Sequence, residues 1–168
     1  LFYRQNHRGR LRRSTDGGKT CENLSTIFAA ETPMHERLVF QNSLLIDPVT
    51  PENMYFCATK KPITQVGGPY AKTLSKGDYG FHRSFDGGFT WELSNHGFPE
   101  GSSVRRVVLH PENPEMLFAA VNSANGGLYR SMNKGGNWNK MKIPSVIQHV
   151  NNIFIDRNTK HFYLSCGN

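Results

Sequence analysis

Short apolar runs come in pairs along this chain, and each pair is separated by a turn rich in proline or asparagine. The three pairs are 43–48 with 54–58, 106–111 with 116–121, and 152–157 with 161–165. Apolar runs bounded by turn residues are typical of β-strands. Their nearly continuous hydrophobicity predicts inner strands that are buried on both faces. No segment has convincing helical periodicity, so the pattern predicts an all-β fold.

A second pattern, eight residues long, occurs three times, at 14–21, 84–91 and 131–138. Each copy has a hydroxyl residue, an Asp or Asn two positions later, a glycine-rich turn and a bulky closing position. The positions that define it are Ser14, Asp16 and Gly18 in the first copy, Ser84, Asp86, Gly88 and Trp91 in the second, and Ser131, Asn133 and Trp138 in the third. Such a segment predicts a tight β-hairpin, because Asp or Asn accepts backbone amide hydrogen bonds and glycine adopts positive φ. We expect the tryptophans to begin the next strand with a large buried ring.

This octapeptide resembles the Asp-box, also called the BNR repeat. Segments 80–88 and 127–131 look like the box together with the strand that leads into it. The resemblance implies a β-propeller of the superfamily that includes sialidases, xyloglucanase-type glycoside hydrolases, sortilin-type receptors and photosystem assembly factors. It is specific for architecture but not for activity, because proteins with unrelated functions share the box.

The spacing of boxes and apolar runs predicts one propeller segment over residues 1–168, with repeat units at approximately 1–24, 38–94, 102–142 and 150–168. If the strands of a blade are a, b, c and d, with the box between c and d, the chain contains b-c-d, a-b-c-d, a-b-c-d and a-b. A propeller closes with about 4 to 8 four-stranded blades, and this is material for roughly three. We therefore expect an incomplete propeller. Either the remaining blades come from the same protein, or further copies of the chain complete the ring.

The formal net charge of +7 would suit nucleic acid, an anionic polysaccharide or an acidic protein partner. The alternative is that the basic residues only form solvated faces of the blades. The basic residues are dispersed between the amino end and the loop at 60–76, and no nucleic-acid-binding module is evident, so nucleic acid is not expected as a partner. No apolar stretch is long enough to span a membrane. The three cysteines and seven histidines have no metal-ligand spacing, and we expect neither a metal nor a cofactor.

In propellers of the resembled family, the b–c and d–a loops form the functional mouth, opposite the boxes. The longest such loop here is 60–79. Tyr70 and Tyr79 in this loop are candidates to stack on a sugar or a partner side chain, and Lys72 and Asp78 are candidates to hydrogen-bond to hydroxyls. The alternative is a surface loop without a binding role.

Glycoside hydrolysis needs two carboxyl groups at a defined separation. Asp16 and Asp86 are poor candidates, because the box needs them as turn acceptors. The loops offer Asp78 and Glu100 as candidate catalytic carboxylates, with Glu31 and Glu36 as further loop acids. No complete pair is identifiable, so whether the chain is an enzyme stays open.

Two functions remain. The first is a segment of a secreted carbohydrate-active protein, most like the xyloglucanase-type hydrolases. The second is a non-catalytic propeller that acts as a protein-binding scaffold or assembly factor. An extracellular or periplasmic location is implied by the family resemblance only.

Overall fold

All regular secondary structure in the described part of the chain is β-strand. The computed structural model describes residues 2–5, 10–26, 44–58, 80–144, 147 and 149–167. Within these ranges all regular elements are strands, β1 to β13. Consistent with this, no helix in the described ranges has the length and apolar character needed to cross a membrane.

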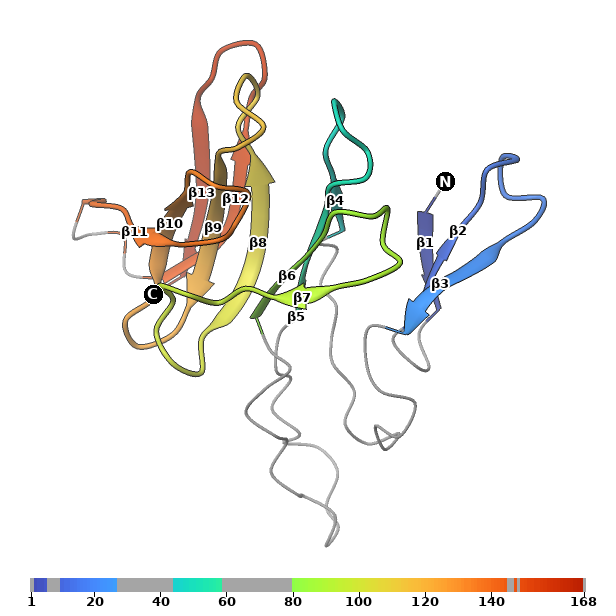
Figure 1. Cartoon of the computed structure of the whole chain (residues 1–168). Helices are drawn as coiled ribbons and strands as arrows, with labels where there is room; N and C mark the ends of the chain where they lie inside the picture. The colour runs from blue at the N-terminus through green and yellow to red at the C-terminus, as the bar shows by residue number, and fades with distance from the viewer. Residues whose placement is uncertain are drawn as a thin grey trace, which may run out of the picture.

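The strands form four antiparallel sheets that follow one another in chain order (Figure 1). The first contains β1 (Phe2–Gln5), β2 (Arg10–Arg13) and β3 (Glu22–Thr26). The second contains β4 (Leu45–Ile46), β5 (Met54–Ala58), β6 (Gly80–Ser84) and β7 (Glu92–Leu93). The third contains β8 (Ser103–Leu109), β9 (Leu117–Asn122), β10 (Gly127–Ser131) and β11 (Asn139–Lys140). The fourth contains β12 (His149–Ile155) and β13 (Phe162–Gly167).

The two four-stranded sheets have the same internal arrangement. Their strand orders are β4-β5-β6-β7 and β8-β9-β10-β11. Ser84 pairs with Met54 in one sheet, and Ser131 pairs with Leu117 in the other, so strands b and c have the same register in both. The first sheet supplies b-c-d and the last supplies a-b, which confirms the strand order predicted from sequence. We call the four sheets blades 1 to 4.

Strand β9 shows why the inner strands are apolar on both faces. Its residues from Leu117 to Val121 are all buried. Ala119 lies in a hydrophobic cluster with residues of blade 2, whereas Ala120 lies in a second cluster with residues of blade 4. Successive side chains of a strand point to opposite faces of the sheet. Strand β9 therefore supplies apolar side chains to two interfaces, which explains its nearly continuous hydrophobicity.

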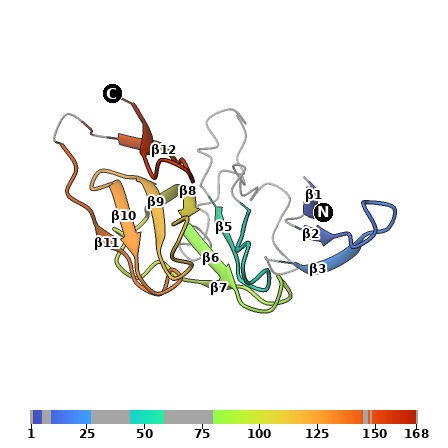
Figure 2. The same ribbon diagram turned by 90° about the horizontal axis from the view of Figure 1, so that it is seen from above.

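The hydrophobic core consequently lies between neighbouring blades. Viewed from above, the sheets stand side by side around an arc, with β5 next to β8 and β8 next to β12 (Figure 2). At the interface between blades 2 and 3, Trp138 packs edge-on against Phe81 with ring centroids 5.0 Å apart. The same indole stacks on Phe98 at 4.8 Å. This aromatic packing joins blades 2 and 3.

Candidate functional site

The blades present two opposite rims, and Figure 1 shows how the connections are divided between them. The turns between a and b strands, such as 47–53 and 110–116, lie at one end. The box turns between c and d strands belong to this same end, because β6 and β10 run antiparallel to β5 and β9. The b–c connection 123–126 and the d–a connection 94–102 lie at the other end. We call these ends the box rim and the mouth rim.

On the box rim, the turn of blade 2 is organised by Ser84 and Asp86. The Ser84 hydroxyl donates to Asp86 Oδ1 at 2.7 Å and accepts the amide of Gly88 at 2.9 Å. Asp86 in turn accepts the amide of Thr90 at 2.9 Å and the hydroxyl of Thr90. The turn can close this tightly because Gly87 and Gly88 have φ of 73° and 90°.

The other two box turns repeat these hydrogen bonds. In blade 1, Asp16 accepts the Ser14 hydroxyl and the amide of Thr20. In blade 3, Asn133 accepts the Ser131 hydroxyl at 2.9 Å and the amide of Asn137 at 2.9 Å. Lys134 stands there in place of the first glycine and still adopts a φ of 53°. The equivalent positions thus lie at equivalent hairpin bends.

The carboxylates of these turns are held in their ionised form. Hydrogen bonds from the side chain and backbone of Thr20, and from Ser14, lower the pKa of Asp16 to about 2. Burial raises the pKa of Asp86, but the hydrogen bonds from Thr90 and Ser84 outweigh it and lower this pKa to about 2. A general acid needs the opposite shift. These aspartates therefore act as turn acceptors and not as proton donors.

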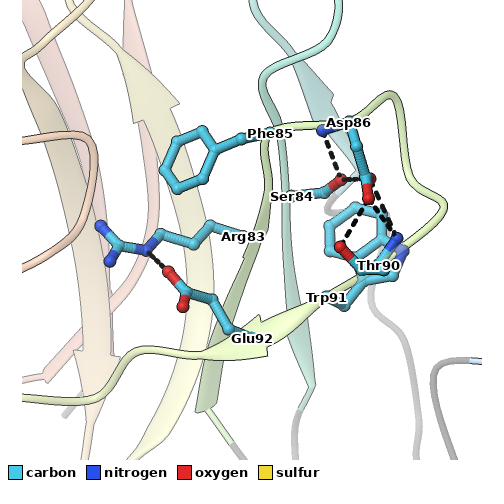
Figure 3. A pocket seen from close by; sticks show the side chains of 7 residues that line it. All are labelled: Arg83, Ser84, Phe85, Asp86, Thr90, Trp91 and Glu92. Carbon is cyan, nitrogen blue, oxygen red and sulfur yellow. Dashed lines mark hydrogen bonds and ion pairs between the residues drawn. The ribbon is translucent and has the colours of Figure 1, made fainter.

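An open hollow of about 230 Å³ lies beside the box of blade 2 (Figure 3). It is lined by Arg83, Ser84, Phe85, Asp86, Thr90, Trp91 and Glu92. The guanidinium of Arg83 forms an ion pair with Glu92, and the same guanidinium lies 5.1 Å from the centre of the Phe85 ring. Arg83 and Glu92 pair with each other, and Asp86 is held by Ser84 and Thr90, so the hollow offers no unpaired acid or base for catalysis.

The two box tryptophans differ in burial. Trp138 is 3% exposed and agrees with the expectation of a buried ring, whereas Trp91 is only partly buried. The indole of Trp91 donates to the Gly88 carbonyl of its own turn at 2.9 Å. That of Trp138 donates to the Ser94 carbonyl of the preceding blade at 3.2 Å. The expected large buried ring is therefore found at Trp138, whereas the ring of Trp91 is buried only in part.

The mouth rim contains one of the predicted carboxylates. Glu100 is exposed in the connection between β7 and β8. Ser102 donates to the carbonyl of Pro99 at 2.6 Å and shapes this loop. Nearby strand ends are joined by a hydrogen bond from Asn122 to Asn151 of 3.0 Å. Within the described segments of this rim (94–103, 122–127, 141–144 and 149–151), Glu100 is the only carboxylate, so these segments contain no catalytic pair.

The other predicted mouth residues cannot be placed. Tyr70, Lys72, Asp78 and Tyr79 lie outside the described residues, as do Glu31 and Glu36. Their roles in binding or catalysis stay predictions. Among the residues that are described, no group of three or more potential ligands could hold a metal ion.

Sequence reasoning did not identify a role for the arginine that precedes each box serine. Arg13 and Arg83 pair with Glu22 and Glu92, respectively, on the adjacent d strands. The guanidinium of Arg13 lies 5.1 Å from the Phe89 ring of the next box, and Arg83 donates to the Lys134 carbonyl of the box after it. The signal was present in the sequence, since Arg130 occupies the same position in the third copy.

Comparisons with known proteins agree with this geometry. A region of 106 residues, 60% of the chain, is 28% identical to a xyloglucanase from a Paenibacillus species and covers 9% of that protein. The chain is a partial match to GH74 xyloglucanases in sequence and structure. No family model matches the chain.

Three solved structures show the same fold at low sequence identity. An ancestral GH74 enzyme aligns with 95% of this chain at a TM-score of 0.61 and 18% identity. The Niastella koreensis GH74 enzyme aligns with 94% at 0.62 and 17%, and the Xanthomonas campestris GH74 xyloglucanase with 94% at 0.61 and 15%. The predicted Asp-box β-propeller architecture is confirmed. The chain spans about a fifth of these structures, 20% of the first and 22% of the other two, so it supplies part of such a propeller.

Proposed function

We propose that the chain is part of a secreted, polysaccharide-acting β-propeller of the xyloglucanase kind. The observation that carries this proposal is the joint likeness, in sequence to a xyloglucanase and in fold to GH74 enzymes. The geometry supports it, because the box rim is occupied by turn-forming hydrogen bonds while the mouth rim is left for ligands. Loops on a rigid scaffold are where binding residues concentrate.

In this proposal the mouth rim of blades 2 to 4 is one wall of a polysaccharide-binding surface. Glu100 contributes an exposed carboxylate, and the loop at 60–79 contributes Tyr70, Lys72, Asp78 and Tyr79. Aromatic rings provide apolar faces for stacking on sugar rings. Because the described segments of this rim have a single carboxylate, a catalytic pair would need Asp78, Glu31 or Glu36, or a residue from other blades.

The test is hydrolysis and binding of xyloglucan by the protein that contains this chain. We expect Tyr70→Ala and Tyr79→Ala to weaken binding, because each removes a stacking face. If Asp78 and Glu100 take part in catalysis, Asp78→Asn and Glu100→Gln reduce kcat by 10²-fold or more, about the contribution of general acid–base catalysis.

A matched control is Glu52→Gln, which removes an exposed carboxylate from the a–b turn on the box rim. This variant should bind and hydrolyse xyloglucan as the unmodified protein does. If all four mouth substitutions also leave binding and hydrolysis unchanged, the proposed surface is wrong.

The alternative is a non-catalytic propeller that binds a protein partner. The net charge of +7 and the single carboxylate on the described mouth rim favour it. An acidic partner would then bind more weakly as ionic strength rises. Absence of xyloglucan hydrolysis and binding, together with salt-sensitive capture of an acidic protein, would select this function.

A further inference from the structure

The a strands begin at the mouth rim, and near that end they share a pair of polar residues. In β8 the pair is Arg105 and Arg106, and in β12 it is Asn151 and Asn152, each followed by three apolar residues. The sequence has asparagine and serine at 42–43 before three apolar residues in the same way, although this pair lies outside the described residues. Polar residues therefore interrupt the apolar pattern of these strands at one and the same place.

A β-bulge lies at this place in both described strands. In blade 3 the pairing of β8 with β9 shifts between Val104 and Arg106, so Arg105 is the extra residue. In blade 4 the pairing of β12 with β13 shifts in the same way, and Asn151 is the extra residue. A bulge changes the direction of a side chain, and bulges are over-represented next to active sites. Two successive blades thus have a redirected polar side chain near the mouth rim.

Asn151 shows where the bulge directs its side chain. The Nδ2 atom of Asn122 donates to Asn151 Oδ1 at 3.0 Å, and Asn122 ends β9 in the preceding blade. Asn122 lies opposite Ser103, where β8 begins. The bulge residue of blade 4 therefore reaches the mouth end of blade 3, close to the strand that contains Arg105. Both asparagines are at least partly exposed, so the amide groups not used in this bond are accessible to a ligand.

In blade 3 the two residues at this place are cations. Both arginines are partly buried, and the Nε atom of Arg105 is shielded from solvent without a hydrogen-bond partner. None of the ion pairs among the described residues includes Arg105 or Arg106. Burial raises the pKa of the Cys57 thiol and the charge of Arg106 opposes this rise, so Arg106 lies near blade 2. A buried donor without an acceptor is costly, and its presence needs a physical reason.

The charge of the surrounding rim indicates what this reason is. Glu100 is the only carboxylate in the described mouth segments. Lys142 is exposed, and the Nζ atom of Lys140 donates to the Asn125 carbonyl in the b–c turn at 3.1 Å. Together with the two arginines, these lysines make the described part of the rim basic. Such a surface attracts an anionic ligand and disfavours a cationic one.

We propose that Arg105 and Arg106 bind the carboxylate of an acidic sugar, so that the mouth rim accepts a uronate-containing polysaccharide. This inference rests on the proposed function, in which the mouth rim binds a polysaccharide, and adds the chemical class of one of its sugars. A planar guanidinium donates two parallel hydrogen bonds that match the two oxygens of a carboxylate. The amides of Asn122 and Asn151 bond to the hydroxyl groups of the same or the adjoining sugar.

A polysaccharide is favoured over an acidic peptide for two reasons. The chain resembles a xyloglucanase in sequence, and its exposed amides suit a ligand that is rich in hydroxyl groups. The carboxylate distinguishes this ligand from a neutral polysaccharide, which gives the unpartnered Nε atom of Arg105 no charged acceptor.

The experiment measures the binding of two matched probes to the protein that contains this chain. One is an oligogalacturonate, and the other is the same oligomer with its carboxyl groups reduced to primary alcohols. Calorimetric titration at low ionic strength should show that the acidic oligomer binds about tenfold more tightly, the scale of one charge-assisted hydrogen bond. This difference should shrink as salt is added. The comparison uses the unmodified protein, so it does not depend on how a substitution affects folding.

Substitutions then assign the preference to the two arginines. Arg105→Gln and Arg106→Gln should each weaken binding of the oligogalacturonate about tenfold and leave the affinity for the reduced oligomer unchanged. Arg105→Lys keeps the charge but loses the planar pair of donors, so its affinity should be intermediate. The matched control is Arg157→Gln, which removes an exposed arginine from the a–b turn of blade 4 and should change neither affinity. Thermal unfolding verifies that each variant is folded.

Equal affinity for the two oligomers, or no binding of either, would overturn the inference. So would a preference for the acidic oligomer that is the same in both glutamine variants as in the unmodified protein. If xyloglucan is nevertheless bound and hydrolysed, the proposed function stands and only the acidic sugar is wrong. If no glycan binds, but a polyglutamate peptide binds in a manner that depends on Arg105 and on salt, the site takes an acidic protein and both proposals fail.

Discussion

The indole N–H of Trp138 donates to the carbonyl oxygen of Ser94 at a distance of 3.2 Å, which joins two blades across 44 residues of sequence. The box turn, although its own hydrogen bonds are local, therefore also helps to attach blade 3 to blade 2, together with residues of β8 and β9. The ring of Trp138 also contacts Phe81 and Phe98. A residue that closes a hairpin thus has its main packing role in the interface.

Two substitutions of Trp138 should separate the contribution of ring packing from that of the indole hydrogen bond to Ser94. Trp138→Ala removes both the ring and the hydrogen bond and should lower the free energy of unfolding by about 3–5 kcal/mol. Trp138→Phe retains an aromatic ring but leaves the Ser94 carbonyl without its donor, and should cost about 1–3 kcal/mol. Denaturant unfolding measures both. Equal losses in the two variants would show that ring packing contributes little.

Gly97 lies against the same tryptophan, and we expect its replacement by alanine to destabilise the fold strongly. A Cβ at Gly97 would meet the Trp138 carbonyl oxygen at 2.0 Å, and the residue has a φ of 97°. Backbone strain and overpacking together should cost about 3 kcal/mol or more in the free energy of unfolding.

Gly101→Ala is the matched control for this substitution. Gly101 also has positive φ, at 68°, but no atom lies within 4 Å of a Cβ built there. It should therefore show only the strain of the left-handed conformation, about 1–2 kcal/mol. If Gly97→Ala is no more destabilising than Gly101→Ala, the close approach of Trp138 is not rigid.

The local part of this fold was predictable from the sequence because it depends on neighbouring residues. Apolar runs such as that containing Leu117 to Val121 indicate strands buried on both faces, and Ser84 with Asp86 indicates a hairpin whose hydrogen bonds span a few positions. From these, the strand order of all four blades followed. Each prediction uses only the chemistry of a short segment.

The contacts between blades were not predictable in the same way. Arg83 reaches the Lys134 carbonyl 51 residues later, and this pairing exists only once two sheets are positioned against each other. The difference between Trp91 and Trp138 has the same origin, because their surroundings belong to different blades. The candidate binding residues of the mouth loop lie outside the described residues, so their placement stays a prediction.

Acid should destabilise the chain partly through its box aspartates. The folded-state pKa of Asp86 and of Asp16 is about 2, below the ordinary value of 3.8. Between pH 3.8 and about 2 the unfolded state binds more protons than the folded state. The stability contributed by each ionised carboxylate is therefore present above about pH 4 and is lost as the pH falls towards 2. Urea unfolding at a series of pH values should show this decline.

Two reciprocal variants assign the decline to the boxes. Asp86→Asn should fold, because Asn133 forms the equivalent turn in blade 3, and it should flatten the dependence of stability on pH below about 4. Asn133→Asp should make the dependence steeper. Unchanged pH dependence in both variants would show that other carboxylates cause acid unfolding.

The preference of buried His82 for its neutral form should make stability fall at a higher pH than the box aspartates do. Burial lowers the pKa of His82 from 6.5 to about 4, against a smaller opposing effect of a backbone hydrogen bond at Gly80. The neutral imidazole stacks on Phe56 with ring centroids 4.4 Å apart. Between these two pKa values the unfolded state binds a proton that the folded state does not. Stability is therefore complete above about pH 6.5 and should fall by about 3 kcal/mol as the pH drops to 4.

His82→Phe should remove this slope, because it keeps an aromatic ring at a position where blade 3 has the buried Tyr129. Denaturant unfolding between pH 7 and pH 4 measures the slope, and NMR titration of the His82 imidazole measures its pKa directly. A folded-state pKa near 6.5, or an unchanged slope in His82→Phe, would mean that water reaches this ring. The surroundings of His82 would then be more open than its stacking on Phe56 indicates.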